Sequence, residues 1–142
     1  MQHEPSRSPD SVDSNLLLDV FTEDPAWLDW SSRSLSAAAE SGPLFVNPIV
    51  YAEVSVRFSR VEDLEDALPA SEFRRAPLPW AAAFLAGKAF TAYRRSQGGA
   101  PVPLPDFYIG AHAAVDGLAL LTRDGGRYRT YFPTLELITP QP

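Results

Sequence analysis

The sequence has no cysteine, and histidine occurs at only two of its 142 positions, His3 and His112. Disulfides and thiolate metal sites are therefore excluded, and a zinc site built on imidazoles would have too few donors. Any metal that binds must take mainly oxygen ligands. Among the divalent metals that prefer such ligands, we expect magnesium or manganese.

Long apolar runs are also missing. No stretch is long enough to cross a bilayer, and residues 1–11 are polar and lack the apolar centre of a secretory signal. We therefore expect a cytoplasmic protein that does not act at a membrane. The 142 residues, 45% of them hydrophobic and 21% charged, suffice for one compact domain. We expect that domain over residues 12–142, behind an extended or disordered tail over 1–11.

Lysine is nearly absent, because eleven of the twelve basic residues are arginines and Lys88 is the exception. The net charge of −6 argues at first sight against a nucleic-acid partner. The distribution of charge matters more than its sum, however, and arginine suits bidentate contact with phosphate. Arg123, Arg127 and Arg129 gather in one short segment, although ordinary surface charge would give the same pattern.

Short apolar strands alternate with helical segments along the chain. Strands are predicted at 44–46, 73–78, 118–122 and 135–138, and a further strand should end at Val12. Helices are predicted around 16–21 and over 25–42, 47–58, 61–68, 80–95 and 105–117, with a loop at 97–105. This alternation is typical of βαβ units. The fold class should therefore be α/β, with a central, mostly parallel sheet covered by helices on both faces.

Two aspartates follow predicted strands. Asp13 comes directly after the first strand, and Asp124 comes two residues after the strand at 118–122. In open parallel sheets, ligand sites form beyond the carboxyl ends of strands, where the strand order reverses. Each residue also has a purely structural explanation. Asp13 could cap the following helix, and Asp124 could be a turn residue before Gly125 and Gly126.

Glu53 lies on a predicted helix, in mostly apolar surroundings. Its neighbours three and four positions away are Ile49, Val50, Val56 and Arg57. A carboxylate in such a row is costly unless it is paired or binds a metal. We favour a metal-site role over a buried ion pair with an arginine, because the other acids also lie at positions where a ligand site is expected.

Asp106 lies in the first turn of a predicted helix, behind Pro105. Acids are favoured there by helix capping and by the helix dipole, which explains the residue without any function. Its helical row continues through Gly110, Ala113 and Gly117, which are all small. That face could pack against the sheet edge and bring Asp106 to the other acids.

Four segments carry a resemblance to a known family, in the order DSNLLLDVF at 13–21, NPIVYAE at 47–53, LPDFYIGAHA at 104–113 and LLTRD at 120–124. Over about residues 12–140, the sequence resembles the PIN domains, particularly the VapC toxins of bacterial toxin–antitoxin pairs. No single segment is specific, but four in order make the match strong. The resemblance implies a three-layer α/β/α fold.

The resemblance also implies a metal site, made of Asp13, Glu53, Asp106 and Asp124. Asn15 and Thr122 would support this site. Its carboxylates would hold magnesium or manganese, which lowers the pKa of bound water and offsets charge on the phosphoryl transition state. Two arginines are candidates for contact with RNA phosphates, namely Arg123 and Arg127.

By resemblance, the chain is a ribonuclease that forms homodimers and is covered by a cognate antitoxin. The leading hypothesis is therefore a metal-dependent toxin that cleaves RNA. The alternatives are a PIN-type nuclease that processes RNA without an antitoxin, and a catalytically weak domain that binds RNA or protein. The sequence does not select the RNA target.

The residues before Asp13 depart from the family pattern, in which an apolar run forms the central strand. Here the stretch 8–12 contains Pro9, Asp10 and two serines, which are poor material for a central strand. Either the first strand is short and unusual, or the N-terminus has been altered.

Overall fold

The computed structural model describes residues 9–96 and 102–140, which form five strands and seven helices. The strands are β1 (Asp10–Val12), β2 (Leu44–Val46), β3 (Phe73–Arg75), β4 (Ala119–Leu121) and β5 (Leu137–Ile138). The helices are α1 (Ser14–Phe21), α2 (Leu28–Ser41), α3 (Pro48–Ser55), α4 (Val61–Ala67), α5 (Trp80–Arg95), α6 (Leu104–Asp116) and α7 (Gly125–Tyr131). Most of the tail expected over 1–11 and of the loop expected over 97–105 lies outside the described residues, but Asp10 and Ser11 belong to β1.

All neighbouring strands of the sheet run parallel, in the order β3-β2-β1-β4-β5. The predicted parallel sheet is confirmed. The chain moves outward from the central strand β1 to β2 and β3, and then returns to the other side of β1 as β4. The strand order therefore reverses between β1 and β4, where a ligand site is expected beyond the carboxyl ends of the strands.

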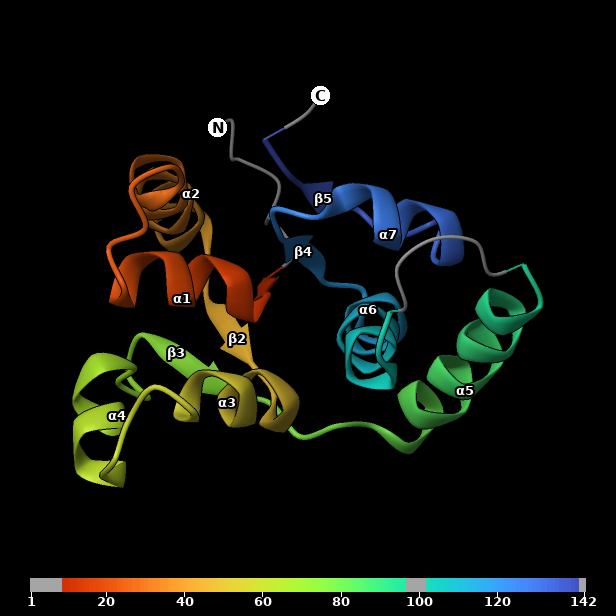
Figure 1. Ribbon diagram of the computed structural model, residues 1–142, viewed down its shortest axis with the longest axis horizontal. Coiled ribbons are helices and arrows are strands. Elements are labelled where there is room, and N and C mark those ends of the chain that lie inside the picture. The colour runs from red at the N-terminus through yellow and green to blue at the C-terminus, as the bar shows by residue number, and fades with distance from the viewer. Residues whose placement is uncertain (1–8, 97–101, 141–142) are drawn as a thin grey trace, which may run out of the picture.

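Helices cover both faces of the sheet, so the predicted three-layer α/β/α fold is confirmed. Figure 1 shows α1 to α4, in red to yellow-green, on the left of the view and α5 to α7, in green to blue, on the right. In this view β4 lies between the two groups, and β3 lies among α1, α3 and α4. In the part of the chain that the structure describes, no helix is long and apolar enough to cross a membrane.

β1 is a short strand with polar residues at the centre of the sheet. Asp10 and Ser11 are 3% and 0% exposed. The Ser11 hydroxyl has no hydrogen-bond partner among the described residues, which costs about 1–3 kcal/mol. Parallel pairing with β2 and β4 on its two sides holds this strand in place, together with the buried Val12. The stretch before Asp13 is thus the short, unusual strand that the sequence allowed.

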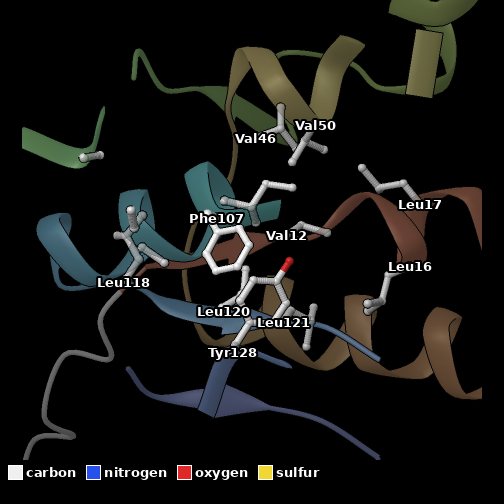
Figure 2. Packing of buried hydrophobic residues seen from close by; sticks show 14 of the residues in the cluster. Val12, Leu16, Leu17, Val46, Val50, Phe107, Leu118, Leu120, Leu121 and Tyr128 are labelled. Carbon is white, nitrogen blue, oxygen red and sulfur yellow. The ribbon is translucent and has the colours of Figure 1, made fainter. Parts of the chain in front are cut away.

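The hydrophobic core forms around the central strands (Figure 2). Val12, Leu120 and Leu121 supply fully buried side chains from β1 and β4. The helices add buried residues around them, among them Leu16, Leu17, Val50, Phe107 and Tyr128. Because the elements that build this core also carry the four acids, core packing determines where the acids lie.

Helix α7 is not predicted by the sequence pattern, which marks a turn at Gly125 and Gly126 instead. A short segment that starts with two glycines has little intrinsic tendency to be helical. Tertiary packing decides the outcome, because Tyr128 and Phe132 are 1% and 4% exposed and belong to the core. Asp124 is the N-cap residue of this helix rather than part of a simple turn.

Helix α2 begins three residues later than predicted. The Asp24 carboxylate accepts hydrogen bonds from the backbone N–H groups of Ala26 and Trp27, at 2.9 and 3.0 Å. These bonds stabilise a turn, and the helix itself starts at Leu28. The capping residue was therefore recognised, but the element that it caps is the turn before the helix.

Candidate active site between the ends of β1 and β4

The four predicted acids come from separate elements. Asp13 directly follows β1 and Asp124 lies just beyond β4, so both stand at the switch in strand order. Glu53 lies on α3, and Asp106 lies in the first turn of α6. Burial is the main cause of the raised pKa of Asp13, Glu53 and Asp106, and each of these three pKa values is raised further by the charge of another of the four acids. The structure thus brings all four carboxylates into one electrostatically coupled set.

Asp13 is the most deeply buried of the four acids, at 5% exposure. Its Oδ2 accepts hydrogen bonds from the hydroxyls of Thr122 and Tyr128, at 2.8 and 3.0 Å, and its Oδ1 accepts one from the Ser14 N–H at 2.8 Å. Burial raises the pKa of Asp13 to about 6, although these bonds oppose the shift. The predicted helix-capping role of Asp13 is also confirmed, so this residue both caps α1 and faces the site.

Glu53 is only half-buried, and a hydroxyl holds it in place. The Ser14 hydroxyl donates to Glu53 Oε1 at 2.7 Å. Burial is the main cause of a raised pKa at Glu53, the charge of Asp13 raises it further, and the charge of Arg127 lowers it. Glu53 makes no direct ion pair with an arginine among the described residues, so the buried ion pair considered as an alternative is not formed.

Asp106 forms an ion pair with a cationic side chain. Arg127 of α7 donates through its NH1 group to Asp106 Oδ2. Burial raises the pKa of Asp106, the Arg127 charge opposes this shift, and the charges of Glu53 and Asp124 reinforce it. The raised pKa indicates that one guanidinium does not offset the combined effect of burial and the neighbouring carboxylates.

Asn15 connects the two strand ends. Its side-chain amide nitrogen lies 3.4 Å from Asp13 Oδ2, 3.4 Å from Thr122 Oγ1 and 3.5 Å from Asp124 Oδ2. The Thr122 hydroxyl oxygen in turn accepts a hydrogen bond from the Asp124 N–H at 3.1 Å. Both residues that were predicted to support the site therefore contact its acids.

Sequence reasoning missed two residues of the site, Ser14 and Tyr128. Ser14 lies inside the DSN segment, where its position between Asp13 and Asn15 was the available signal. Tyr128 lies on the unpredicted helix α7, so no local signal marked it. Burial first, and then the charges of Asp13 and Asp106, raise the pKa of Tyr128 well above its usual value, which keeps the phenol a hydrogen-bond donor.

His112 lies away from the acids, as its spacing from Asp106 predicted. It is fully buried, with Nδ1 at 3.0 Å from the Asn47 side-chain nitrogen and Nε2 at 3.0 Å from Asp116 Oδ2. Burial lowers the pKa of His112, against the influence of Asp116, so the ring is neutral and accepts at Nδ1. The histidine joins α6 to the start of α3 and has a structural role.

Arg123 and Arg127 both contact carboxylates. Arg127 pairs with Asp106 inside the acidic set, and its side chain is 36% exposed. Arg123 pairs instead with Asp19 of α1, at 2.7 Å, and its side chain is 27% exposed. Of the two predicted phosphate contacts, only Arg127 thus has its guanidinium at the site.

The side chains of the site suit a hard divalent cation. All four offer carboxylate oxygens, which magnesium and manganese prefer, and a cation would relieve the repulsion between them. Within residues 9–96 and 102–140, no three acidic or histidine side chains form a ready-made metal-ligand group. The residues therefore suit such a cation through their donor type and charge, although the described side chains do not form a preassembled group of ligands.

A parallel α/β/α sheet with an acidic site at its switch point defines the class of this molecule. The family model described as PIN domain matches residues 11–133. The chain therefore belongs to the PIN domain family. No curated protein matches the sequence.

Several solved structures share this fold. VapBC2 from Rickettsia felis, bound to a promoter DNA fragment, matches with a TM-score of 0.70 and 18% identity over 92% of this chain and 98% of that chain. A toxin–antitoxin complex from Klebsiella pneumoniae matches with a TM-score of 0.66 and 22% identity over 92% and 97%. DNA-bound VapBC from Salmonella typhimurium matches with a TM-score of 0.65 and 16% identity over 94% and 98%. At these identities the likeness concerns the fold.

Proposed function

We propose that this chain is a metal-dependent ribonuclease and acts as the toxin of a toxin–antitoxin pair. One observation carries the proposal: carboxylates from separate elements lie beyond the ends of β1 and β4, and burial together with the charge of a neighbouring acid raises the pKa of Asp13, Glu53 and Asp106. Membership in the PIN family and the similarity to toxin–antitoxin structures support it.

Asp13, Glu53, Asp106 and Asp124 would hold magnesium or manganese. When bound, the ion lowers the pKa of a water molecule and offsets the negative charge of the phosphoryl transition state. The protein contributes the position of the carboxylates. Two of them lie just beyond β1 and β4 and the other two lie on α3 and α6, so the packed core sets their position.

Hydroxyl groups orient two of the acids, Asp13 and Glu53. Thr122 and Tyr128 donate to Asp13 Oδ2, so this oxygen is held while Oδ1 is directed toward the start of α1. Ser14 donates to Glu53 in the same way. Such contacts fix a carboxylate in one orientation and tune its affinity for a metal.

Arg127 is the residue that we assign to RNA phosphate. In the structure it pairs with Asp106. A divalent cation on Asp106 would compete with this guanidinium, because both neutralise the same carboxylate. Arginine binds phosphate oxygens in a bidentate manner, so a released Arg127 would suit the RNA backbone.

Helix α5 has an exposed apolar surface, to which we assign the binding of a partner protein. Trp80 and Phe84 are 91% and 70% exposed, and large apolar side chains in such a position favour protein contact. The two partners that we assign to this protein are a second copy of this chain and a cognate antitoxin that covers the acidic site. Cytoplasmic RNA, transfer or ribosomal, would be the substrate.

The test compares wild-type protein with Asp106→Asn, and with Asp63→Asn as a matched control on the exposed face of α4. Labelled RNA is incubated with magnesium or manganese, or with a chelator, and RNA ends are sequenced after induction in cells. We expect cleavage that needs the metal, is lost in Asp106→Asn and persists in Asp63→Asn. Equal cleavage by Asp106→Asn, or cleavage in chelator, would contradict the proposal.

Two alternatives remain. A nuclease that processes RNA without an antitoxin would cleave RNA in the same assay, but no adjacent small gene would encode a DNA-binding antitoxin. A catalytically weak domain would bind RNA and leave its ends unchanged.

A further inference from the structure

Arg123 stands between two residues of the site but points away from it. Its guanidinium makes a bidentate contact with Asp19 of α1, with Nε at 2.9 Å from Oδ2 and NH2 at 2.7 Å from Oδ1. The Asp19 side chain is 3% exposed and that of Arg123 is 27% exposed. This ion pair, called here the Asp19–Arg123 pair, is therefore largely shielded from solvent.

Helix α2 and Trp27, the residue before it, complete the surroundings of the Asp19–Arg123 pair. The fully buried Ser31 donates its hydroxyl to Asp19 Oδ2 at 2.7 Å. The Trp27 ring lies 5.0 Å from the Arg123 Cζ atom, which is a cation–π distance. The segment after β4 is thus anchored to α1 and α2 through one side chain.

The neighbours of Arg123 on both sides face the acids. Thr122 donates to Asp13, and the Asp124 carboxylate lies 3.5 Å from the Asn15 amide nitrogen. The Arg123 N–H itself lies 3.4 Å from Asn15 Oδ1. The Asp19–Arg123 pair therefore constrains the backbone segment that carries both Thr122 and Asp124.

Stability alone does not explain a shielded ion pair at this position. Replacement of such pairs by apolar residues is often neutral or stabilising, because two charges must be desolvated to form the pair. What the bidentate contact supplies is a defined geometry. Asp124 is exposed and lies beyond the end of the strand, where its N–H donates to Thr122 Oγ1 and its carboxylate lies as far as 3.5 Å from the Asn15 amide nitrogen.

We propose that Arg123 is a positioning residue: by pairing with Asp19, it holds the segment 122–124 so that Asp124 joins the metal-binding carboxylates. The inference rests on the proposed function for its metal. It also replaces the predicted contact between Arg123 and RNA phosphate, because the guanidinium is already engaged with Asp19.

The test is the neutral double variant Asp19→Asn/Arg123→Met, which removes both charges and leaves neither unpaired. The matched control is Asp29→Asn/Arg33→Met, which removes an ion pair of 2.6 Å on α2 whose side chains are 81% and 74% exposed. Thermal unfolding first establishes that both full-length variants fold. Calorimetric titration with Mn²⁺ then measures metal affinity.

We expect the Asp19/Arg123 variant to bind Mn²⁺ roughly tenfold or more weakly, the usual effect of removing a group that orients a ligand. The control should bind like the wild type, and Arg123→Lys should fall between the two. A folded double variant with wild-type Mn²⁺ affinity would overturn the positioning role.

A metal-free measurement separates this inference from the proposed function. The side-chain amide signal of Asn15 in an NMR spectrum, identified by its loss in Asn15→Asp, reports the contact with Asp124 and Arg123. We expect this signal to shift in the double variant and to stay in place in the control. An unmoved signal would overturn the positioning role, whereas a wild-type protein that binds no Mn²⁺ would overturn the proposed function.

Discussion

Asp13 carries a buried charge whose cost its hydrogen bonds only partly offset. Its pKa is raised from 3.8 to about 6, chiefly by burial and against the hydrogen bonds from Thr122, Tyr128 and Ser14. In the metal-free protein, the native state therefore binds a proton more tightly than the unfolded state does. By linkage, the stability from this group is complete below about pH 4 and is lost as pH rises through about 6.

We predict that Asp13→Asn stabilises the metal-free protein at neutral pH but not at acidic pH. The gain over wild type should grow by about 2–3 kcal/mol between about pH 4 and pH 7.5, because each pKa unit corresponds to about 1.4 kcal/mol. Urea unfolding in chelator at several pH values measures this difference. The exposed Glu40→Gln on α2 serves as control, and a gain for Asp13→Asn that does not vary with pH would contradict the explanation.

At the scale of elements, the contact between α6 and α7 couples packing to the site. Gly110 was expected to pack against the sheet edge, but it faces α7 instead. A Cβ atom at Gly110 would lie 2.6 Å from the Phe132 ring and 2.9 Å from the Tyr128 ring. The glycine therefore permits the close approach that lets Tyr128 reach Asp13.

We predict that Gly110→Ala destabilises the protein by about 1–3 kcal/mol, the usual cost of overpacking a core. Gly87→Ala on α5 is the matched control, because a Cβ atom there would meet nothing within 4 Å. Gly87→Ala should stabilise the protein by up to about 1 kcal/mol, since alanine has a higher helix propensity than glycine. Chemical denaturation measures both, and equal effects of the two substitutions would contradict the packing argument.

At the scale of the whole molecule, the negative charges of the buried acids lower the stability of the folded state when no metal is bound. The chain carries a net charge of −6, and burial has raised the pKa of three of its acids at one place. Anything that neutralises these acids should favour the folded state. Protons and divalent cations do this in competition, because both bind the same oxygens.

We predict that magnesium or manganese raises the melting temperature and that a chelator reverses the rise. At a metal concentration a hundred times Kd, the gain is about 2.7 kcal/mol, or roughly 5–10 °C for a chain of this size. The effect should shrink as pH falls below about 6, because protons then occupy Asp13. Thermal scans measure it, and the same rise in Asp13→Asn would place the cation elsewhere.

Much of the fold was predictable because its signals are local. Apolar triplets such as Leu44–Val46 mark strands, and Asn47 with Pro48 marks the start of α3, where the Asn47 side chain accepts from the Val50 N–H at 3.0 Å. β1 and α7 lack such signals. β1 consists largely of polar residues, and α7 begins with two glycines. Both elements form because neighbouring elements pack on them.

The sequence by itself determined the alternation of strands and helices and the oxygen-donor chemistry of any metal site, and it predicts the four acids that would form such a site. Only the tertiary structure decided that Ser14 and Tyr128 orient those acids and that Arg123 binds Asp19 instead of facing the site. The physical reason is distance along the chain. Tyr128 and Asp13 are 115 positions apart, and Arg123 and Asp19 are 104 apart, so their contacts depend on how the core packs and leave no periodic signal.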